Sequence, residues 1–376
     1  KSFDELLVFT RPSIHFIPPI LGRYLNLASY QSLQGLYIKM LYCSGVDMFK
    51  QMLEHAEKEL ERLEEPFEYN DVIELATKKL ITSLNETEES QVKDLINSND
   101  EFIKNNRKRW EVGFTKLHVL RSLSLEAGME FQKQFLSIPE YKTDPLLGVL
   151  MRQHANACRI TGEIIHLLEG GYPDAALARW RTLYEIAVTC LVIQKYGNGA
   201  AIEYIKHGKV KAVEGMEEYQ KTASEMGLKP YSEEEMNEAR SLKEEITKGK
   251  KHYHWALEYT GFSKLEKLRE DVGLGKWSHN YKWASRGVHA DYRDMLSLSA
   301  MSEAKNDGLL VGSSNSGLTE PAHFTAITIS QITSAFLLAY IQEDTQLNYT
   351  NSIMFMNLIS HYSNDVGDAF LCASQL

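Results

Sequence analysis

Hydrophobic residues recur every three to four positions along most of this chain, the period of an α-helix with one buried face. The clearest example runs from Pro173 to Ile193 and reads PDAALARWRTLYEIAVTCLVI. Pro173 suits a first helical turn, and between Ile186 and Ile193 the only polar side chain is that of Thr189. We therefore predict that this helix is central to the fold and that its second half is buried on all sides.

Similar periodicity predicts further helices on both sides of this one, and no segment alternates with the period of a β-strand. We predict an all-α fold, a multi-helix bundle with a helical N-terminal region. The most polar stretch divides the chain into an N-terminal helical region, 1–100, and a C-terminal helical bundle, 101–376. The predicted helices cover residues 29–65, 71–84, 88–103, 110–136, 145–169, 200–226, 233–249, 262–272, 280–302, 321–342 and 352–371, with a polar turn at 85–90.

Composition narrows the class of protein. A hydrophobic content of 43% and a charged content of 24% are ordinary for a globular protein that is soluble in water. The formal net charge of −10 argues against broad, sequence-independent nucleic-acid binding, although it permits a local basic site. Phe324–Gln342 carries no charge but is rich in Thr, Ser and Gln, so we predict a buried core helix rather than a membrane span.

The four cysteines are far apart in the sequence and show no zinc-binding spacing. Cys158 and Cys190 fall in apolar helical patterns, so we predict small buried side chains without disulfide partners, as in a cytoplasmic protein. No signal peptide is visible. Glycine-rich nucleotide loops and serine or cysteine nucleophile motifs are also absent from the sequence, and we therefore expect no cofactor.

One group of polar residues interrupts the apolar pattern. Arg181 and Glu185 lie one turn apart at the edge of the central helix. If they meet the predicted helix 280–302, Glu185 can orient a histidine and Arg181 can hold an anion. The alternative is a surface ion pair beside a solvated helix face. That second helix carries a polar residue at every fourth position, namely Tyr281, Ser285, His289 and Arg293, and Trp255 is expected to add an aromatic wall.

Two short motifs among these residues resemble those of a known protein family. Arg181–Glu185 reads R-T-L-Y-E, and Tyr281–His289 contains Y-x-x-x-S-x-x-x-H. Together with Trp255, these motifs resemble a widespread prokaryotic family of helical proteins of unknown function, over Trp110 to Ile341. The resemblance implies a helical fold and a shared polar site, and it supplies no reaction.

A second constellation joins Arg159 and His166 in the segment RITGEIIH. Seven residues are nearly two helical turns, so both side chains lie on the same side of a helix. The pair is similar to the Arg…His signature of HEPN-type ribonucleases, in which two subunits form one metal-independent acid–base site. The resemblance implies a homodimeric effector that cleaves or binds RNA, in bacterial stress or phage defence. A salt bridge from Arg159 to Glu163 at the helix edge is the alternative.

A third pattern, E-x-x-H, occurs at Glu163–His166 and at Glu320–His323. Two such pairs resemble the ligands of carboxylate-bridged di-metal bundles. Chance alone yields about one pair in a chain of this composition, so we expect no bound metal.

Three functions remain open. The first is the HEPN-like RNA-directed effector, and the second is a non-enzymatic helical module that binds an anionic ligand or a protein partner. The third is a metal-dependent helical-bundle enzyme. The charge-free helix offers more apolar surface than one bundle hides, and we therefore expect a homodimer.

Overall fold

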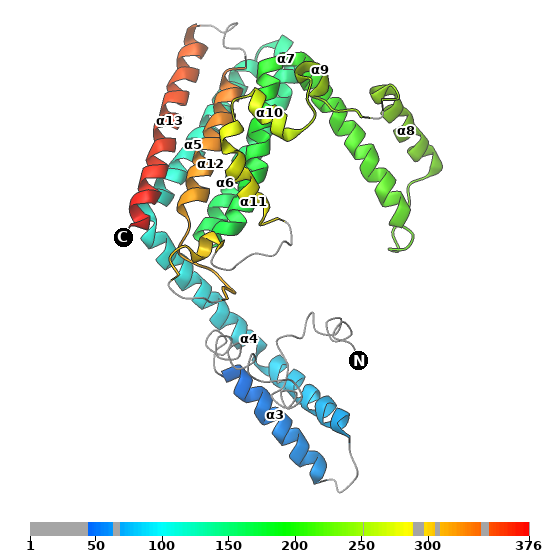
Figure 1. The fold of residues 1–376 in the computed structure, drawn as a ribbon, viewed down its shortest axis with the longest axis vertical. Helices are drawn as coiled ribbons and strands as arrows, with labels where there is room; N and C mark the ends of the chain where they lie inside the picture. Colours follow the sequence, from blue (N-terminus) through cyan, green and yellow to red (C-terminus); the bar gives the residue numbers. More distant parts are fainter. Residues whose placement is uncertain are drawn as a thin grey trace. The chain divides into compact units, whose positions relative to one another are not determined.

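The structure is a computed structural model that describes residues 44–62, 68–250, 252–288, 297–304, 309–339 and 346–375. These residues form α-helices, short 3-10 helices and connecting loops, with no β-strand among them, which confirms the all-α prediction (Figure 1). Their contacts divide the chain into two compact units, Lys1–Glu101 with Asn306–Val311 and Phe102–Lys305 with Gly312–Leu376. The division into two domains stays a prediction, because a compact unit is not the same as an independently folding domain.

The first unit contains helix α3 (Ser44–Glu61) and most of α4 (Tyr69–Arg109). Its small buried core consists of Ala56, Val72 and Ala76. The predicted turn at 85–90 is wrong, because α4 runs through it without a break. The segment Tyr69–Arg109 contains neither Gly nor Pro, and the Thr87 hydroxyl donates to the carbonyl of Ser83 within the helix instead of ending it.

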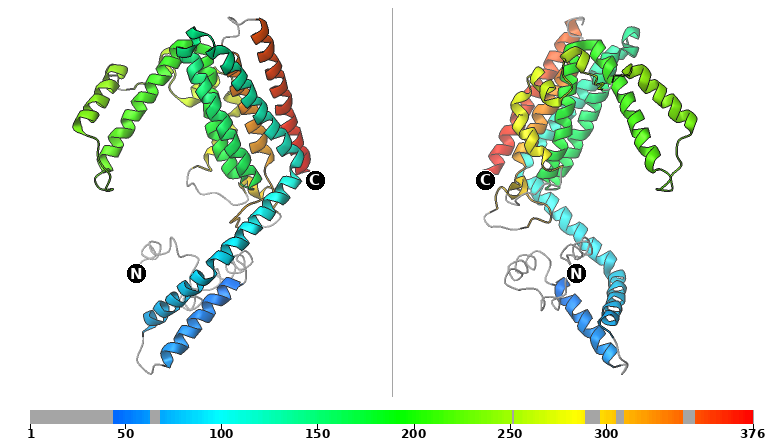
Figure 2. Two further views of the ribbon diagram at one scale, coloured as in Figure 1. Left: turned by 180° about the vertical axis from the view of Figure 1, so that it is seen from behind. Right: turned by 45° about the vertical axis from the view of Figure 1, so that its right-hand side comes forward.

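The second unit is built around a bundle of five long helices that pack side by side (Figures 1 and 2). Local signals fix the ends of α6: the Asp144 side chain accepts a hydrogen bond from the Leu147 amide at 2.7 Å, and Gly170 follows the last residue. The helices are α5 (Glu111–Leu136), α6 (Pro145–Glu169), the first half of α7 (Pro173–Thr222), α12 (Thr319–Leu337) and α13 (Gln346–Ser374).

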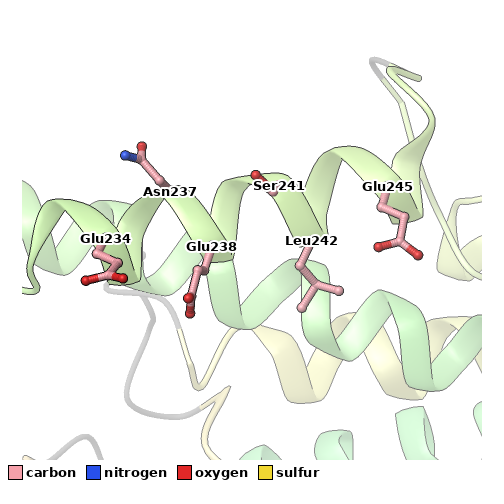
Figure 3. Close-up of a pocket in the computed structure, with 6 residues that line it drawn as sticks. All are labelled: Glu234, Asn237, Glu238, Ser241, Leu242 and Glu245. Carbon is pink, nitrogen blue, oxygen red and sulfur yellow. The ribbon is translucent and has the colours of Figure 1, made fainter.

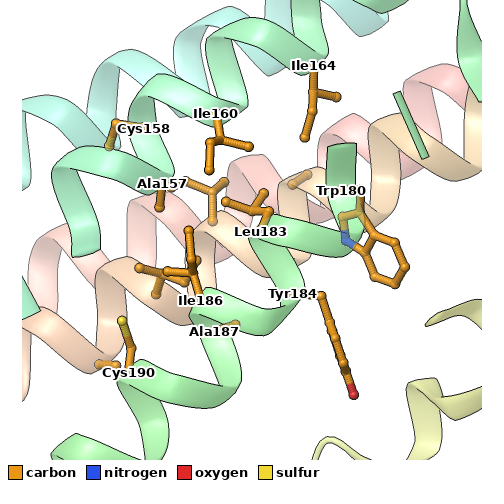
Figure 4. Packing of buried hydrophobic residues seen from close by; sticks show 14 of the residues in the cluster. Ala157, Cys158, Ile160, Ile164, Trp180, Leu183, Tyr184, Ile186, Ala187 and Cys190 are labelled. Atoms are coloured by element: carbon orange, nitrogen blue, oxygen red, sulfur yellow. The ribbon is translucent and has the colours of Figure 1, made fainter. Parts of the chain in front are cut away.

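Helix α7 supplies the largest buried side chains of this bundle. Figure 4 shows Leu183, Ile186 and Ala187 of α7 packed against neighbouring helices, beside Ile160 of α6. Trp180 is 1% exposed, and its indole N–H donates to the Thr328 hydroxyl of α12 at 2.9 Å. The segment before residue 194 is therefore the buried central helix that the sequence predicts.

The chain breaks the helical conformation once within α7, at Gly197 (φ 74°, ψ −156°). Only glycine adopts such angles without strain. Asn198 ties this break to the start of α6, because its side-chain oxygen accepts from the Leu146 amide at 2.9 Å and its amide group donates to Asp144 at 3.0 Å. A Cβ at Gly199 would collide with the Tyr259 hydroxyl.

Beyond Gly197, α7 forms a helical hairpin with α8 (Glu233–Thr247) (Figure 2). Helix α8 begins with a capping box: the Glu235 amide donates to the Ser232 hydroxyl at 3.2 Å, and the Ser232 amide donates to the Glu235 carboxylate at 2.8 Å. The two helices predicted at 173–193 and 200–226 therefore correspond to the two halves of α7, which the break at Gly197 separates.

Short elements connect the hairpin to α12. The predicted long helix 280–302 is wrong, because α11 ends at Ser285 and is followed by turns up to Val288. Glycine is a poor helix former, and Gly287 lies where the helix stops. Residues 289–296 lie outside the described part of the chain. The short elements are α9 (Leu257–Thr260), α10 (Leu265–Asp271), η3 (Gly275–Trp277), α11 (Ser278–Ser285) and η5 (Ser299–Met301), and a further short helix, η2 (Pro139–Thr143), precedes α6.

Helix α12, which contains most of the predicted charge-free segment, is largely buried, and hydroxyl groups on it form hydrogen bonds within the helix. The hydroxyls of Thr325, Ser330 and Thr333 donate to carbonyl oxygens four residues earlier on α12. No helix among the described residues is long and apolar enough to cross a membrane. Cys158 and Cys190 are buried and unpaired, and burial raises the pKa of both thiols to about 12.

Candidate functional site

Arg181, Glu185 and Tyr281 form one contact network between α7 and α11. The Arg181 Nε donates to the Tyr281 hydroxyl at 2.9 Å, and that hydroxyl donates to the Glu185 carboxylate at 2.5 Å. Arg181 Nε also lies 3.3 Å from Glu185. The predicted meeting of the central helix with Tyr281 is therefore present, and the three side chains form a polar cluster at the edge of the core.

One buried tyrosine, Tyr184, holds this cluster in place. Tyr184 lies beneath it, 1% exposed, and its hydroxyl donates to the carbonyl of Leu274 at 2.9 Å. The Tyr184 ring packs against that of Tyr281 with centroids 5.4 Å apart. Burial raises the pKa of Tyr184 to about 12, so its hydroxyl remains a hydrogen-bond donor at neutral pH.

The electrostatics of the cluster favour a charged arginine. Burial by itself lowers the pKa of Arg181, but the Tyr281 hydroxyl and the Glu185 carboxylate more than offset this effect and leave that pKa above its ordinary value. Burial and the Glu185 carboxylate raise the pKa of Tyr281, although Arg181 opposes them. The cluster thus presents a permanent cation beside a neutral phenol.

Arg269 of α10 is a further member of this cluster that the sequence reasoning missed. It is 4% exposed, and its guanidinium carbon lies 5.7 Å from the centre of the Tyr281 ring, while that of Arg181 lies 5.1 Å from the same centre. No acidic side chain among the described residues pairs with Arg269, and its buried Nε has no hydrogen-bond partner there. The indole N–H of Trp277 is also buried, and no described residue supplies an acceptor for it.

A sequence signal for Arg269 existed. Leu265, Arg269 and Val272 lie at positions i, i+4 and i+7, so the arginine occupies the apolar face of its short helix. A charge at an apolar position requires a partner, because an unpaired buried charge is costly. The rule that singles out Arg181 and Glu185 therefore singles out Arg269 as well.

Other predicted members of this site are placed differently. His289 and Arg293 lie outside the described residues. Ser285 is the last residue of α11, and its hydroxyl donates to the carbonyl of Tyr281 at 2.8 Å. Because α11 ends there, the predicted four-residue stripe on one continuous helix is wrong beyond Ser285.

Trp255 lies against the second half of α7. It is 5% exposed and packs edge-on against Tyr204, with ring centroids 5.1 Å apart. The neighbouring His254 stacks on Trp255 and lies 5.0 Å from the ring of His207. Burial, together with the nearby His207 and Lys211, lowers the pKa of His254 to about 4. Trp255 therefore belongs to the hydrophobic packing between α7 and the segment 253–256.

The Arg159–His166 pair lies on the outer side of α6, with both residues exposed. The Arg159 guanidinium donates to the Glu163 carboxylate and to the Asn156 side chain. Glu163 also accepts from Arg179 at 2.5 Å. The salt-bridged helix edge is therefore present.

A buried carboxylate lies at the end of α6. The Glu169 side chain, 10% exposed, accepts from Arg107 at 2.6 Å and lies 3.0 Å from the His118 ring. Burial opposes ionisation of Glu169, but these partners lower its pKa on balance. Asn106 donates to the carbonyls of Leu168 and Glu169 at 2.9 Å each. These contacts tie the end of α6 to α4 and α5, so we assign them a structural role.

Acidic and histidine side chains do not assemble into a metal-binding group within the described residues. Glu163 is engaged by two arginines, and His323 packs against Gly367 of α13. Figure 3 shows the hollow along α8, where Glu234, Glu238 and Glu245 lie on one side of the helix. All residues of this hollow come from a single helix, and it is a solvated acidic surface.

Residues 147–308 match the model of a family of unknown function (DUF5677). This match confirms the predicted resemblance to a family of unknown function, over a shorter range than predicted, and it includes Arg181, Glu185, Arg269 and Tyr281. Neither a curated protein nor a solved structure matches the chain.

Proposed function

We propose that this protein binds a small anionic ligand at Arg181, Arg269 and Tyr281. The observation that carries the proposal is the buried guanidinium of Arg269, which has no acidic partner among the described residues. Removing such a charge from water costs several kcal/mol unless an anion compensates it. Arg181 pairs with the half-exposed carboxylate of Glu185, and Arg269 has no such partner among the described residues, so this part of the cluster keeps an excess of positive charge.

The geometry of the cluster suits recognition of an oxyanion. Guanidinium groups present several N–H donors in a plane and match phosphate or carboxylate oxygens. The Glu185 carboxylate, held by Tyr281 and Arg181, occupies a place that a ligand oxygen can also take. We therefore expect the ligand to compete with Glu185 for these donors.

Thermal unfolding in inorganic phosphate tests this proposal. A ligand that binds only the folded chain raises its free energy of unfolding, by about 2.7 kcal/mol at a concentration of one hundred times Kd. We expect phosphate to raise Tm, and Arg181→Gln and Arg269→Gln to abolish that rise. Lys282→Gln is the matched control, because it removes an exposed positive charge next to Tyr281 and should leave the rise intact.

Two outcomes oppose the proposal. If phosphate, sulfate and acetate all leave Tm of the parent protein unchanged, Arg269 is compensated by the chain itself. Equal losses in Arg269→Gln and Lys282→Gln would show a general ionic effect. If Arg269→Gln does not fold, Tyr281→Phe removes only one hydroxyl and should weaken phosphate binding in a folded protein.

A second candidate function is HEPN-like, metal-independent RNA cleavage by a homodimer. It is favoured by the exposure of both Arg159 and His166 on one side of α6, where a second subunit or RNA can reach them. Light scattering should then give about twice the 42.9 kDa chain mass.

RNA cleavage separates the two sites. His166→Ala and Arg159→Ala should abolish cleavage while leaving the dimer intact, because exposed side chains contribute little to packing. Loss of cleavage in His289→Ala alone would move the reaction to the Arg181 cluster. Absence of cleavage by a well-folded dimer would exclude this second function. Its context in bacterial stress or phage defence rests on resemblance.

A further inference from the structure

A cleft with a volume of about 380 Å³ lies between α7, α12 and α13, away from the Arg181 cluster on the same bundle. Its size falls in the range of small-molecule sites. Every residue that lines it is uncharged, and none is aromatic. This composition excludes an ion pair with a ligand and leaves hydrogen bonding and apolar contact as the means of recognition.

The carboxamide groups of this cleft make no hydrogen bond to other described residues. Carboxamides reach it from all three helices, namely Gln194 of α7, Gln331 of α12 and Asn364 of α13. Within the described residues these side chains have no hydrogen-bond partner in the chain. Ser363 of α13 also lines the cleft, and its hydroxyl adds a further polar group to the lining.

Besides its carboxamides and serines, the cleft has an apolar part. Leu191 of α7, Ile327 of α12 and Met356 of α13 each contribute to the cleft. These flexible or branched side chains can cover the face of a flat ring, and a thioether adapts readily to its shape. The cleft thus combines groups that donate and accept hydrogen bonds with apolar surface.

We propose that this cleft binds an uncharged heterocycle of the nucleobase class, either free or as its nucleoside. A carboxamide carries both a donor and an acceptor, and it pairs with the matching edge of a base. A phosphate group gains nothing in the cleft, because no cation lines it. Sugars alone are a poorer fit, because a polyol offers no flat apolar face to the leucine, isoleucine and methionine side chains.

Calorimetric titration of the full chain with adenosine, guanosine, cytidine and uridine tests this proposal. We expect at least one nucleoside to bind at millimolar concentration or below. The corresponding free base should bind as well, and the nucleoside monophosphate should bind no more tightly. Glucose serves as the polyol comparison and should not bind. Failure of all four nucleosides and their bases, or equal binding of glucose, would overturn the proposal.

Variants locate the binding. Gln331→Leu and Asn364→Leu each remove a carboxamide and should weaken nucleoside binding about tenfold, the effect of about 1.4 kcal/mol expected from one lost hydrogen bond. Asn357→Leu is the matched control, because Asn357 is exposed on the same helix and lies outside the cleft. Equal effects of Asn357→Leu and Asn364→Leu would refute the assignment. Phosphate binding through Arg269 is measured separately and does not depend on these residues.

Discussion

The two halves of α7 lie in different surroundings although they belong to one helix. Before Gly197 the helix is packed among α6 and α12, and most of its side chains between Ala176 and Ile193 are buried. Beyond Gly197 it packs on α8 and on the segment 253–256, and its buried side chains are few and mostly small. Ion pairs such as Lys206–Glu203 cover that second half.

This difference shows where a cluster of charged side chains indicates a candidate functional site. Surface ion pairs such as Lys211–Glu214 contribute little to stability, because water screens them. The Arg181 cluster lies against fully buried tyrosine and leucine side chains, where an uncompensated charge matters much more. The same pairing of Arg or Lys with Glu therefore indicates a candidate site in the first half of α7 and a solvated face in the second.

The largest effect should come from core truncation in the first half. Leu183 is 0% exposed, and Leu183→Ala should lower the free energy of unfolding by about 2–5 kcal/mol, because it removes apolar contacts and leaves a cavity. Val213→Ala in the second half removes two methyl groups and should cost roughly 1–2 kcal/mol. Urea unfolding followed by circular dichroism measures both, and equal costs would contradict the comparison.

Acid should weaken the bundle through His154 of α6. Burial lowers the pKa of His154 to about 4, and its ring lies 3.2 Å from the Thr333 hydroxyl. Above pH 6.5 His154 is neutral in both states, whereas between pH 6.5 and 4 only the unfolded chain takes up the proton. Stability should therefore fall by up to about 3 kcal/mol as the pH drops through this window.

Unfolding of His154→Gln at several pH values checks this expectation. The variant should lose most of the difference between pH 7 and pH 4.5. His254→Gln is the comparison, because the pKa of His254 is also lowered to about 4 and this residue packs beside His207 in the second half of α7. If His254→Gln removes the pH dependence and His154→Gln does not, the region around the second half of α7, and not the bundle, limits stability in acid.

The junction between the two halves should respond to substitution of its glycine. Gly197→Ala places a side chain at a φ of 74° and should cost about 1–3 kcal/mol. Gly215→Ala in the second half has free space around it and should instead stabilise the helix by about 0.5–1 kcal/mol. Thermal unfolding of both variants measures these opposite signs, and a shared sign would show that the break is not strained.

The smallest effect should be confined to the hairpin. Ser232→Ala removes the capping box of α8 and should cost about 1 kcal/mol. Hydrogen exchange should report faster exchange of amides in the first turn of α8 and unchanged protection in α6. Loss of protection throughout the bundle would show that the two regions unfold as one unit.

The sequence predicted the elements whose ends carry local signals. Helix α6 has the predicted bounds, because Asp144, Pro145 and Gly170 mark its two ends. The end of α11 was missed, because Tyr281 and Ser285 continue a helical spacing that extends past Gly287. Periodicity shows which residues share a helix face, but it does not show where the backbone leaves the helical conformation.

The candidate site was predictable in part. A meeting of Arg181 with the helix that carries Tyr281 was one of two alternatives in the sequence, and the structure contains the contact. The apolar spacing around Arg269 indicates that this arginine is buried, but its place beside Tyr281 depends on the long-range contact of α10 with α7. The cleft lined by Gln194 and Asn364 has the same origin, because three helices distant in sequence build it.

The hydroxyl groups of α12 set different limits on how this sequence can evolve. Thr325 is buried and donates only to the carbonyl of Pro321 within its own helix, so a mutation to alanine or valine at this position leaves no partner unpaired. Thr328 and Thr333 are bound twice, because they also meet the indole of Trp180 and the ring of His154. Thr325 can therefore be replaced by other small residues during evolution. Thr328 and Thr333 can change only together with Trp180 and His154.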